Sequence, residues 1–169
     1  MMDRWEDRPT EVANLLNPAF TGALLRRSLE AYSTEIRSGM PFGLAFLVLP
    51  MSLHPGTARR FPARPASTPL HAWLQREENR DVLIAFGERV RALVPFTREA
   101  LLFAAYRDVI VFDEAGLLRP GTATLRGITT YREVGDEVKE AFRRSEQVGR
   151  WFALSGTTTT IFTILGVRP

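Results

Sequence analysis

Four acidic residues lie close together near position 136, where paired carboxylates could bind a metal ion or exchange protons with a substrate. They are Glu133, Asp136, Glu137 and Glu140. Basic residues alternate with them, at Arg132, Lys139, Arg143 and Arg144. Opposite charges three or four residues apart on a helix pair with each other. We therefore expect a solvated, self-paired helix face, and a small enzyme with an acidic site over 133–140 is the less favoured alternative.

Two histidines could act as a general base or a metal ligand. His54 lies in a segment rich in proline and glycine without a nearby carboxylate, and His71 lies two residues before Trp73 in an expected helix. Proton transfer needs a second positioned group, which neither histidine has in its sequence neighbourhood. We expect both histidines to be structural.

Short motifs for nucleotide binding and nucleophilic catalysis are missing. A Walker-type phosphate loop needs Gly-Lys followed by Ser or Thr, but the only lysine, Lys139, follows Val138. There is no Gly-x-Gly pair and no Gly-x-Ser-x-Gly elbow. The sequence has no cysteine, which excludes disulfides and thiolate metal sites. We predict a protein that is not an enzyme, with no catalytic residues, no cofactor and no metal.

The composition is that of a globular protein with one core. The 169 residues are 45% hydrophobic and 24% charged, so we predict a single domain over 1–169. The net charge is only +3, and acids interrupt most basic runs. Residues 59–64 are the exception and supply candidate nucleic-acid contacts at Arg59, Arg60 and Arg64. No signal peptide or membrane span is evident, so we expect no membrane contact and a cytoplasmic location.

Helical patterns dominate the two ends of the chain. Asn17 followed by Pro18 predicts the start of a helix over 17–38, with Gly39 as its left-handed end. A second long helix is expected over 131–154. The segment 157–165 is ambiguous, since its β-branched residues favour a strand while Ser155 or Thr157 could cap a helix. We favour the helix.

The middle of the chain predicts strands as well as helices. The apolar run 44–49, between Gly43 and Pro50, suits a buried strand. Three short helices are expected over 69–78, 79–93 and 98–107. Pro95 ends the second helix and Thr97 caps the third, and a β-hairpin over 108–119 follows. This is the order of a winged helix-turn-helix. The fold class predicted is mainly α (α+β), with a winged helix-turn-helix-like core over about 67–120 that carries the N-terminal helix 17–38 and the C-terminal helices 131–165.

The helix over 98–107 would read DNA bases if this were a DNA-binding winged helix. It is apolar nearly all round, and only Arg98, Glu99, Tyr106 and Arg107 could project outward. A helix of this kind packs against protein on all sides. Protein packing is therefore favoured over base reading.

Several segments resemble, in order along the chain, the middle component of bacterial three-component ABC ATPase conflict systems. They are 11–20 (EVANLLNPAF), 44–50 (LAFLVLP), 92–101 (ALVPFTREAL), 148–153 (VGRWFA) and 166–169 (GVRP). The chain is also similar to the small subunit of Lamassu-type defence complexes. The resemblance implies a bridging subunit between an SMC- or RecN-like ABC ATPase and an effector such as a nuclease, with DNA contact only within the complex. It implies no catalytic residues.

The leading hypothesis is thus a non-catalytic adaptor, and the alternative is a winged-helix DNA-binding transcriptional regulator. Interfaces concentrate aromatic residues and arginine. The candidate interaction residues are Asn17, Pro18, Phe20, Trp151, Phe152 and Arg168. Ordinary core packing is the competing interpretation of Trp151 and Phe152. We also predict that the segment 166–169 is docked, because an apolar run leads into it and Gly166 permits a turn.

Overall fold

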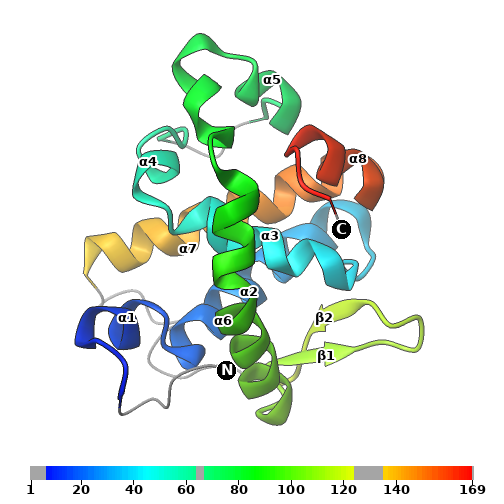
Figure 1. Cartoon of the computed structure of the whole chain (residues 1–169). Helices are drawn as coiled ribbons and strands as arrows, with labels where there is room; N and C mark the ends of the chain where they lie inside the picture. The colour runs from blue at the N-terminus through cyan, green and yellow to red at the C-terminus, as the bar shows by residue number, and fades with distance from the viewer. Residues whose placement is uncertain (1–6, 64–66, 124–134, 169) are drawn as a thin grey trace.

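The computed structural model describes residues 7–63, 67–123 and 135–168, and it is mainly helical (Figure 1). The first half contains α1 (Thr10–Leu15), α2 (Pro18–Ile36), α3 (Phe42–Ser52), α4 (Pro55–Ala58), α5 (Leu70–Leu74) and the 3-10 helix η2 (Glu77–Leu83). The second half contains α6 (Phe86–Tyr106), β1 (Ile110–Phe112), β2 (Leu118–Pro120), α7 (Asp136–Leu154) and α8 (Thr158–Ile164). The β-hairpin projects from the side of the helical body, and α5 and η2 form its upper end in Figure 1.

Helix α2 begins as the sequence predicts. The Asn17 side chain accepts a hydrogen bond from the Ala19 N–H at 2.8 Å, and Pro18 opens the first turn, where no N–H is needed. Its end was predicted wrongly, because Arg37 and not Gly39 takes the left-handed conformation, with φ of 53°. Gly39 has another role, since a Cβ there would lie 2.7 Å from the Cβ of Leu117 in the hairpin. Gly39 therefore lets the hairpin approach the end of α2.

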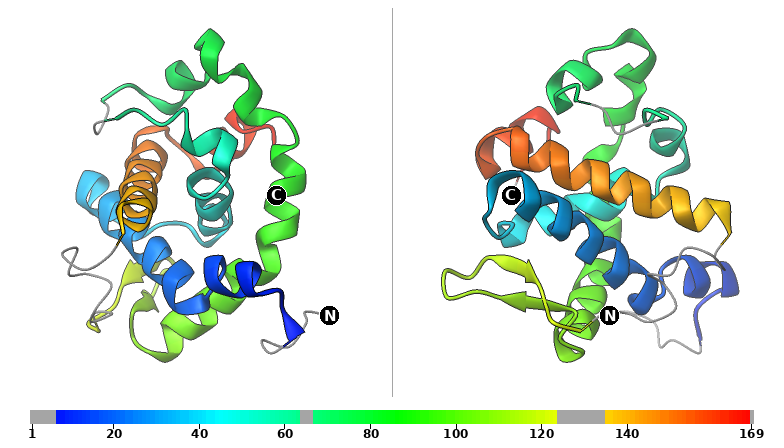
Figure 2. Two further views of the ribbon diagram at one scale, coloured as in Figure 1. Left: turned by 90° about the vertical axis from the view of Figure 1, so that its left-hand side faces the viewer. Right: turned by 180° about the vertical axis from the view of Figure 1, so that it is seen from behind.

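Helices α2 and α7 make the most extensive contact between elements of the described chain, and Figure 2 shows them lying alongside each other. A Cβ at Gly149 of α7 would lie 2.1 Å from the carbonyl oxygen of Ser28 in α2. The other side of α2 meets α6, where Gly22 faces the backbone of Ala100. Helices can approach this closely only where a side chain is missing. Residues 131–134 of the predicted helix 131–154 lie outside the described residues, and the described helix begins at Asp136.

Residues 44–49 form a helix, so the predicted buried strand is wrong. They lie within α3, which packs against α6 and α7, and all of its residues from Leu44 to Ser52 are buried except Phe46. A helix that is apolar all round belongs inside a core. A short, continuous apolar run has no periodicity that separates this arrangement from a buried strand.

Helix α6 corrects the second prediction for the middle of the chain. The expected helices 79–93 and 98–107 are one helix from Phe86 to Tyr106, preceded by η2, and Pro95 lies inside it. Pro95 is exposed, so the helix can tolerate the lost hydrogen bond on its solvent side. Thr97 is fully buried within the helix and caps nothing. A winged-helix core is therefore not confirmed. The expected burial of 98–107 on all sides is also wrong, because Leu102 is 73% exposed.

The β-hairpin agrees with the sequence prediction. β1 and β2 pair antiparallel, with Val111 opposite Arg119. Asp113 organises the turn by accepting hydrogen bonds from the Ala115 and Leu117 N–H groups and from the Arg119 guanidinium, which together hold the pKa of Asp113 below its usual value. At the base of the hairpin, Arg26 of α2 donates to three backbone carbonyls, those of residues 109, 121 and 123. A charged side chain thus attaches the hairpin to the helical body.

The segment 157–165 is helical, as favoured. The Thr157 hydroxyl accepts a hydrogen bond from the Thr160 N–H at 3.2 Å, which satisfies a donor at the start of α8. No helix among residues 7–63, 67–123 and 135–168 is long and apolar enough to cross a membrane.

Candidate functional site

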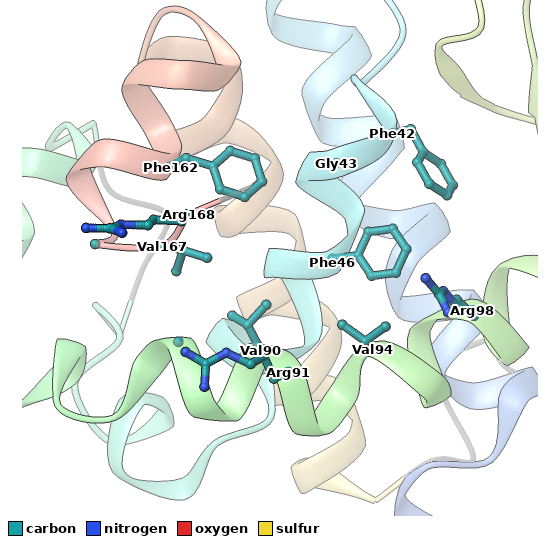
Figure 3. Close-up of a pocket in the computed structure, with 12 residues that line it drawn as sticks. Phe42, Gly43, Phe46, Val90, Arg91, Val94, Arg98, Phe162, Val167 and Arg168 are labelled. Atoms are coloured by element: carbon teal, nitrogen blue, oxygen red, sulfur yellow. The ribbon is translucent and has the colours of Figure 1, made fainter. Parts of the chain in front are cut away.

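An open, largely apolar groove of about 690 Å³ lies between α3, α6, α8 and the segment that follows α8 (Figure 3). This volume is within the range of ligand pockets, roughly 300–1,000 Å³. Six apolar side chains line it: Phe42, Phe46, Val90, Val94, Phe162 and Val167. We call this surface the arginine-rimmed groove, because its remaining side chains are arginines.

The wall formed by the segment after α8 has a defined capping geometry. The Val167 N–H donates to the Phe162 carbonyl at 3.0 Å, and the Gly166 N–H donates to the Thr163 carbonyl at 3.1 Å. With Gly166 at φ of 65°, these two bonds make a Schellman motif at the end of the helix. The motif turns Val167 back beside Phe162, where both side chains line the groove (Figure 3). The segment through Val167 is therefore docked, while Pro169 lies outside the described residues.

Two glycines leave the groove open. A Cβ at Gly43 of α3 would lie 3.5 Å from the ring of Phe162, which is ordinary contact distance. A Cβ at Gly87 of α6 would meet only the end of the Arg91 side chain, 3.9 Å away. Neither glycine has a positive φ. Their effect here is to remove side-chain volume from the groove walls.

Arg91, Arg98 and Arg168 form the rim, and all three are exposed. No side-chain hydrogen bond or ion pair joins any of their guanidinium groups to the part of the chain that the structure describes. Other arginines of the protein do have such bonds, such as Arg26 with Glu30 at 2.9 Å. Among the described residues that line the groove there is no carboxylate. The rim is thus a concentration of positive charge beside an apolar floor.

The groove continues outward along an aromatic edge. The ring of Phe42 lies 5.2 Å from that of Phe46 inside the groove and 5.9 Å from that of Phe112 on the hairpin. Phe42 is 45% exposed and Phe112 is 53% exposed. The apolar surface therefore extends beyond the hollow itself, from α3 to β1.

A second hollow, of about 820 Å³, lies between the α1–α2 junction, α4 and the start of α7. Its charged residues have both signs, with Arg59 and Arg144 facing Asp136, Glu137 and Glu140. Several of these charges are already engaged. Glu140 binds Arg143 at 2.7 Å, which lowers the pKa of Glu140, and Arg144 donates to the Ser52 carbonyl at 2.7 Å.

Comparison with known protein families identifies the family to which the chain belongs. The family described as ABC-three component (ABC-3C) system Middle Component 3 matches residues 5–169. The chain belongs to this family. No curated protein and no solved structure matches the chain. The resemblance found in the sequence is confirmed at the level of a middle component, which has the other components of an ABC system as its partners.

In this Middle Component 3 family member, the structure places the candidate interaction residues in different environments. Asn17 and Pro18 form the start of α2. Phe20 is half-buried, and its ring makes an edge-to-face contact with that of Phe142, with 6.0 Å between the ring centroids. Trp151 and Phe152 are 1% and 0% exposed. These two are core residues in the described chain, as the competing interpretation holds.

Trp151 has a packing role in the core. The centroid of the Trp151 ring lies 4.7 Å from that of Trp73, with the ring planes tilted by 34°, and Phe61 packs against both rings. The Trp151 indole N–H donates to the Thr68 carbonyl at 2.9 Å. This aromatic cluster attaches α5 to α7, so its role is to stabilise the fold by packing.

Of the six candidates, Arg168 lies at the arginine-rimmed groove. Arg91 and Arg98 of α6 line the same groove, with Arg98 at the end opposite Arg168 in Figure 3. Sequence reasoning did not select Phe42, Phe46 or Arg91, because residues 44–49 were expected to be a strand and α6 was divided in two. Residue spacing could have identified the groove residues of α6, since positions 87, 90, 91, 94 and 98 share one face of a continuous helix.

Two of the three candidate nucleic-acid contacts, Arg59 and Arg60, lie in the described chain, and both are exposed. Arg60 pairs with Asp81 at 3.1 Å, Arg59 lines the second hollow, and Arg64 lies outside the described residues. Glu133 of the acidic group also lies outside them. Asp136 pairs with Lys139 at 3.2 Å, in agreement with the self-paired helix face expected there.

The two histidines have distinct positions. The His54 ring caps α4 by accepting a hydrogen bond from the Thr57 N–H at 3.2 Å, and it contacts the Arg89 guanidinium. Burial, and then the charges of Arg89 and Arg59, lower the pKa of His54. His71 is exposed on α5. In the described residues no group of three or more His, Cys, Asp or Glu side chains could hold a metal ion.

Proposed function

We propose that the chain is a non-catalytic adaptor that bridges an SMC-like ABC ATPase and an effector in a cytoplasmic antiviral or mobile-element defence complex. The observation that carries this proposal is the family match over 5–169, since a middle component acts with other components of an ABC system. The arginine-rimmed groove supports it. Aromatic side chains and arginine are the residue types that protein interfaces concentrate.

The charged groups most able to do chemistry are engaged in structure. Glu140 is held in its charged form by Arg143, which disfavours a role as proton donor. The ring of His54 caps a helix. These assignments support an adaptor that uses surfaces and not a reaction centre.

Co-purification tests the adaptor role. The tagged chain is co-expressed with the ABC ATPase and the effector of its own system, and we expect all three to elute as one complex. Omitting the chain should separate the ATPase from the effector. If the ATPase and effector associate equally well without it, the bridging role is wrong.

Activity assays test the non-catalytic assignment. The purified chain should show no ATPase or nuclease activity above background. Any residual activity is compared with that of the D136A/E137A double variant. An activity that accompanies the wild type and disappears from the double variant contradicts the proposal.

DNA binding tests the alternative, a winged-helix regulator. Gel shifts of the purified chain with duplex DNA at several salt concentrations give the result, because phosphate contacts make affinity fall steeply as salt rises. We expect no binding below micromolar at physiological salt. Submicromolar binding by the chain alone favours the regulator over the adaptor.

A further inference from the structure

The arginine-rimmed groove has the chemistry of a receptor for one kind of partner. We infer that it binds an amphipathic helix of another component of the same ABC system, with apolar side chains inserted between α6 and α8 and with carboxylates facing the arginines. The inference rests on the proposed function, because it names the surface through which the adaptor holds its partner.

The floor of the groove accounts for the apolar half of this partner. Val90 and Val94 of α6 face Phe46 and Phe162 across the hollow (Figure 3). The aromatic edge at Phe42 extends the apolar contact beyond it. Burying such side chains is favourable by about 25 cal/mol for each Å² of apolar surface removed from water. An apolar stripe on the partner would complete the surface that the groove leaves open.

The rim accounts for the acidic half. Arg91, Arg98 and Arg168 are positive, exposed and without an ion-pair partner in the described chain. Guanidinium groups bind carboxylates through two parallel hydrogen bonds. Charge complementarity thus selects a segment whose apolar stripe is flanked by Asp or Glu.

The spacing of the rim favours a helical segment. Arg91 and Arg98 are seven residues apart on α6. That spacing is two helical turns, or about 10 Å along the helix axis. A partner helix lying along α6 would present acids seven residues apart at the same interval and apolar residues between them. This is how an amphipathic helix fits an apolar groove.

Two other classes of ligand fit less well. Single-stranded nucleic acid needs aromatic faces on which successive bases stack. Here three of the six apolar side chains that line the groove, Val90, Val94 and Val167, have no aromatic face. A fatty acid carries one carboxylate, whereas the rim offers three separate guanidinium groups. Both classes are included as arms of the test.

The first experiment measures affinity between the chain and each purified partner component. The variants are R91E/R98E and R168E, which reverse exposed charges, and G87W, which fills the groove without altering charge. R80E is the matched control, because Arg80 is an exposed arginine outside the groove with no ion pair among the described residues. Thermal melts confirm that each variant folds.

We expect R91E/R98E and G87W to weaken binding to one component at least tenfold, while R80E leaves it within twofold. Wild-type affinity should also fall with added salt, and that dependence should weaken in R168E. If the wild type assembles and the groove variants assemble equally well, this inference is overturned while the adaptor role stands. If the wild type binds neither component, the adaptor role itself fails.

The second experiment identifies the occupant. Photoreactive benzoylphenylalanine replaces Phe42, and the complex is cross-linked and sequenced. A cross-link to an acidic, amphipathic segment of the ATPase or effector supports the inference, and one to a basic segment or to a second copy of the chain overturns it. A dT20 oligonucleotide or oleate that binds the wild type below micromolar, and loses binding in R91E/R98E, also overturns it.

Discussion

The α2–α7 crossing and the arginine-rimmed groove both depend on glycine, but for opposite reasons. At the crossing, Gly149 is needed because any Cβ would meet the Ser28 backbone at 2.1 Å. At the groove, Gly43 and Gly87 have room for a Cβ and leave an unfilled hollow. Helices α2 and α7 thus meet backbone to backbone at Gly149, whereas the side chains of α3, α6 and α8 leave a hollow between them. The comparison teaches that a helical glycine can serve close packing, as at Gly149, or can leave space on the surface, as at Gly43 and Gly87.

Gly149→Ala should produce the largest loss of stability. The added methyl group must displace backbone in α2, and overpacking of a core commonly costs 1–3 kcal/mol, so we expect a loss of about 3 kcal/mol in the free energy of unfolding. For a chain of this size that lowers Tm by roughly 6–12 °C. Thermal and chemical denaturation measure both quantities. A loss below about 1 kcal/mol would show that the crossing is not tightly packed.

Deletion of residues 166–169 tests the open region in the same way. The deletion removes the Schellman bonds and the packing of Val167 on Phe162, and we expect a loss of about 1–2 kcal/mol together with loss of complex assembly. Gly166→Ala is the milder companion, because φ of 65° costs a residue with a Cβ about 1 kcal/mol. A truncated chain that keeps its Tm and still assembles makes the segment dispensable.

Gly87→Ala is the matched control for Gly149→Ala. Alanine fits at this position and has the higher helix propensity, so the free energy of unfolding should rise by about 0.5 kcal/mol. Denaturant titration measures the change. A loss of stability at Gly87 as large as that at Gly149 would remove the distinction between the two regions.

Thr97→Val examines the face of α6 that is buried against the body. The Thr97 hydroxyl is buried without a hydrogen-bond partner in the described chain, so replacing it with a methyl group should raise the free energy of unfolding by about 1 kcal/mol. A capping threonine, as the sequence suggested, would instead cost about 1 kcal/mol on substitution. The same denaturant titration separates the two outcomes.

Protonation of His54 at lower pH should have the smallest effect on the stability of the fold. Its pKa is lowered in the folded chain, so the unfolded chain binds the proton more readily and the stability contributed by neutral His54 is present above about pH 6.5. That contribution is lost as pH falls through the lower folded pKa. Melts between pH 7.5 and 5 should show a decline that is shallower in H54N, whose side chain can still cap α4. An equal decline in both proteins contradicts this role.

Local signals in the sequence predicted many of the elements correctly. Asn17 with Pro18 marked the start of α2, Asp113 to Gly116 marked the hairpin turn, and Thr157 marked the cap of α8. Each of these signals acts between residues a few positions apart, so no tertiary contact is needed to read it. The family resemblance was also carried by the sequence alone.

Only the tertiary structure decided the rest, because the forces concerned act between distant segments. Residues 44–49 form a helix that packs against α6 and α7, and α6 continues through Pro95 while it packs against α2. The same packing brings Arg91 and Arg98 of α6 to one groove with Arg168, which lies at least seventy positions away along the chain. Sequence spacing could indicate which residues share a helix face, but the distance between two helices is set by the side chains that fill the space between them.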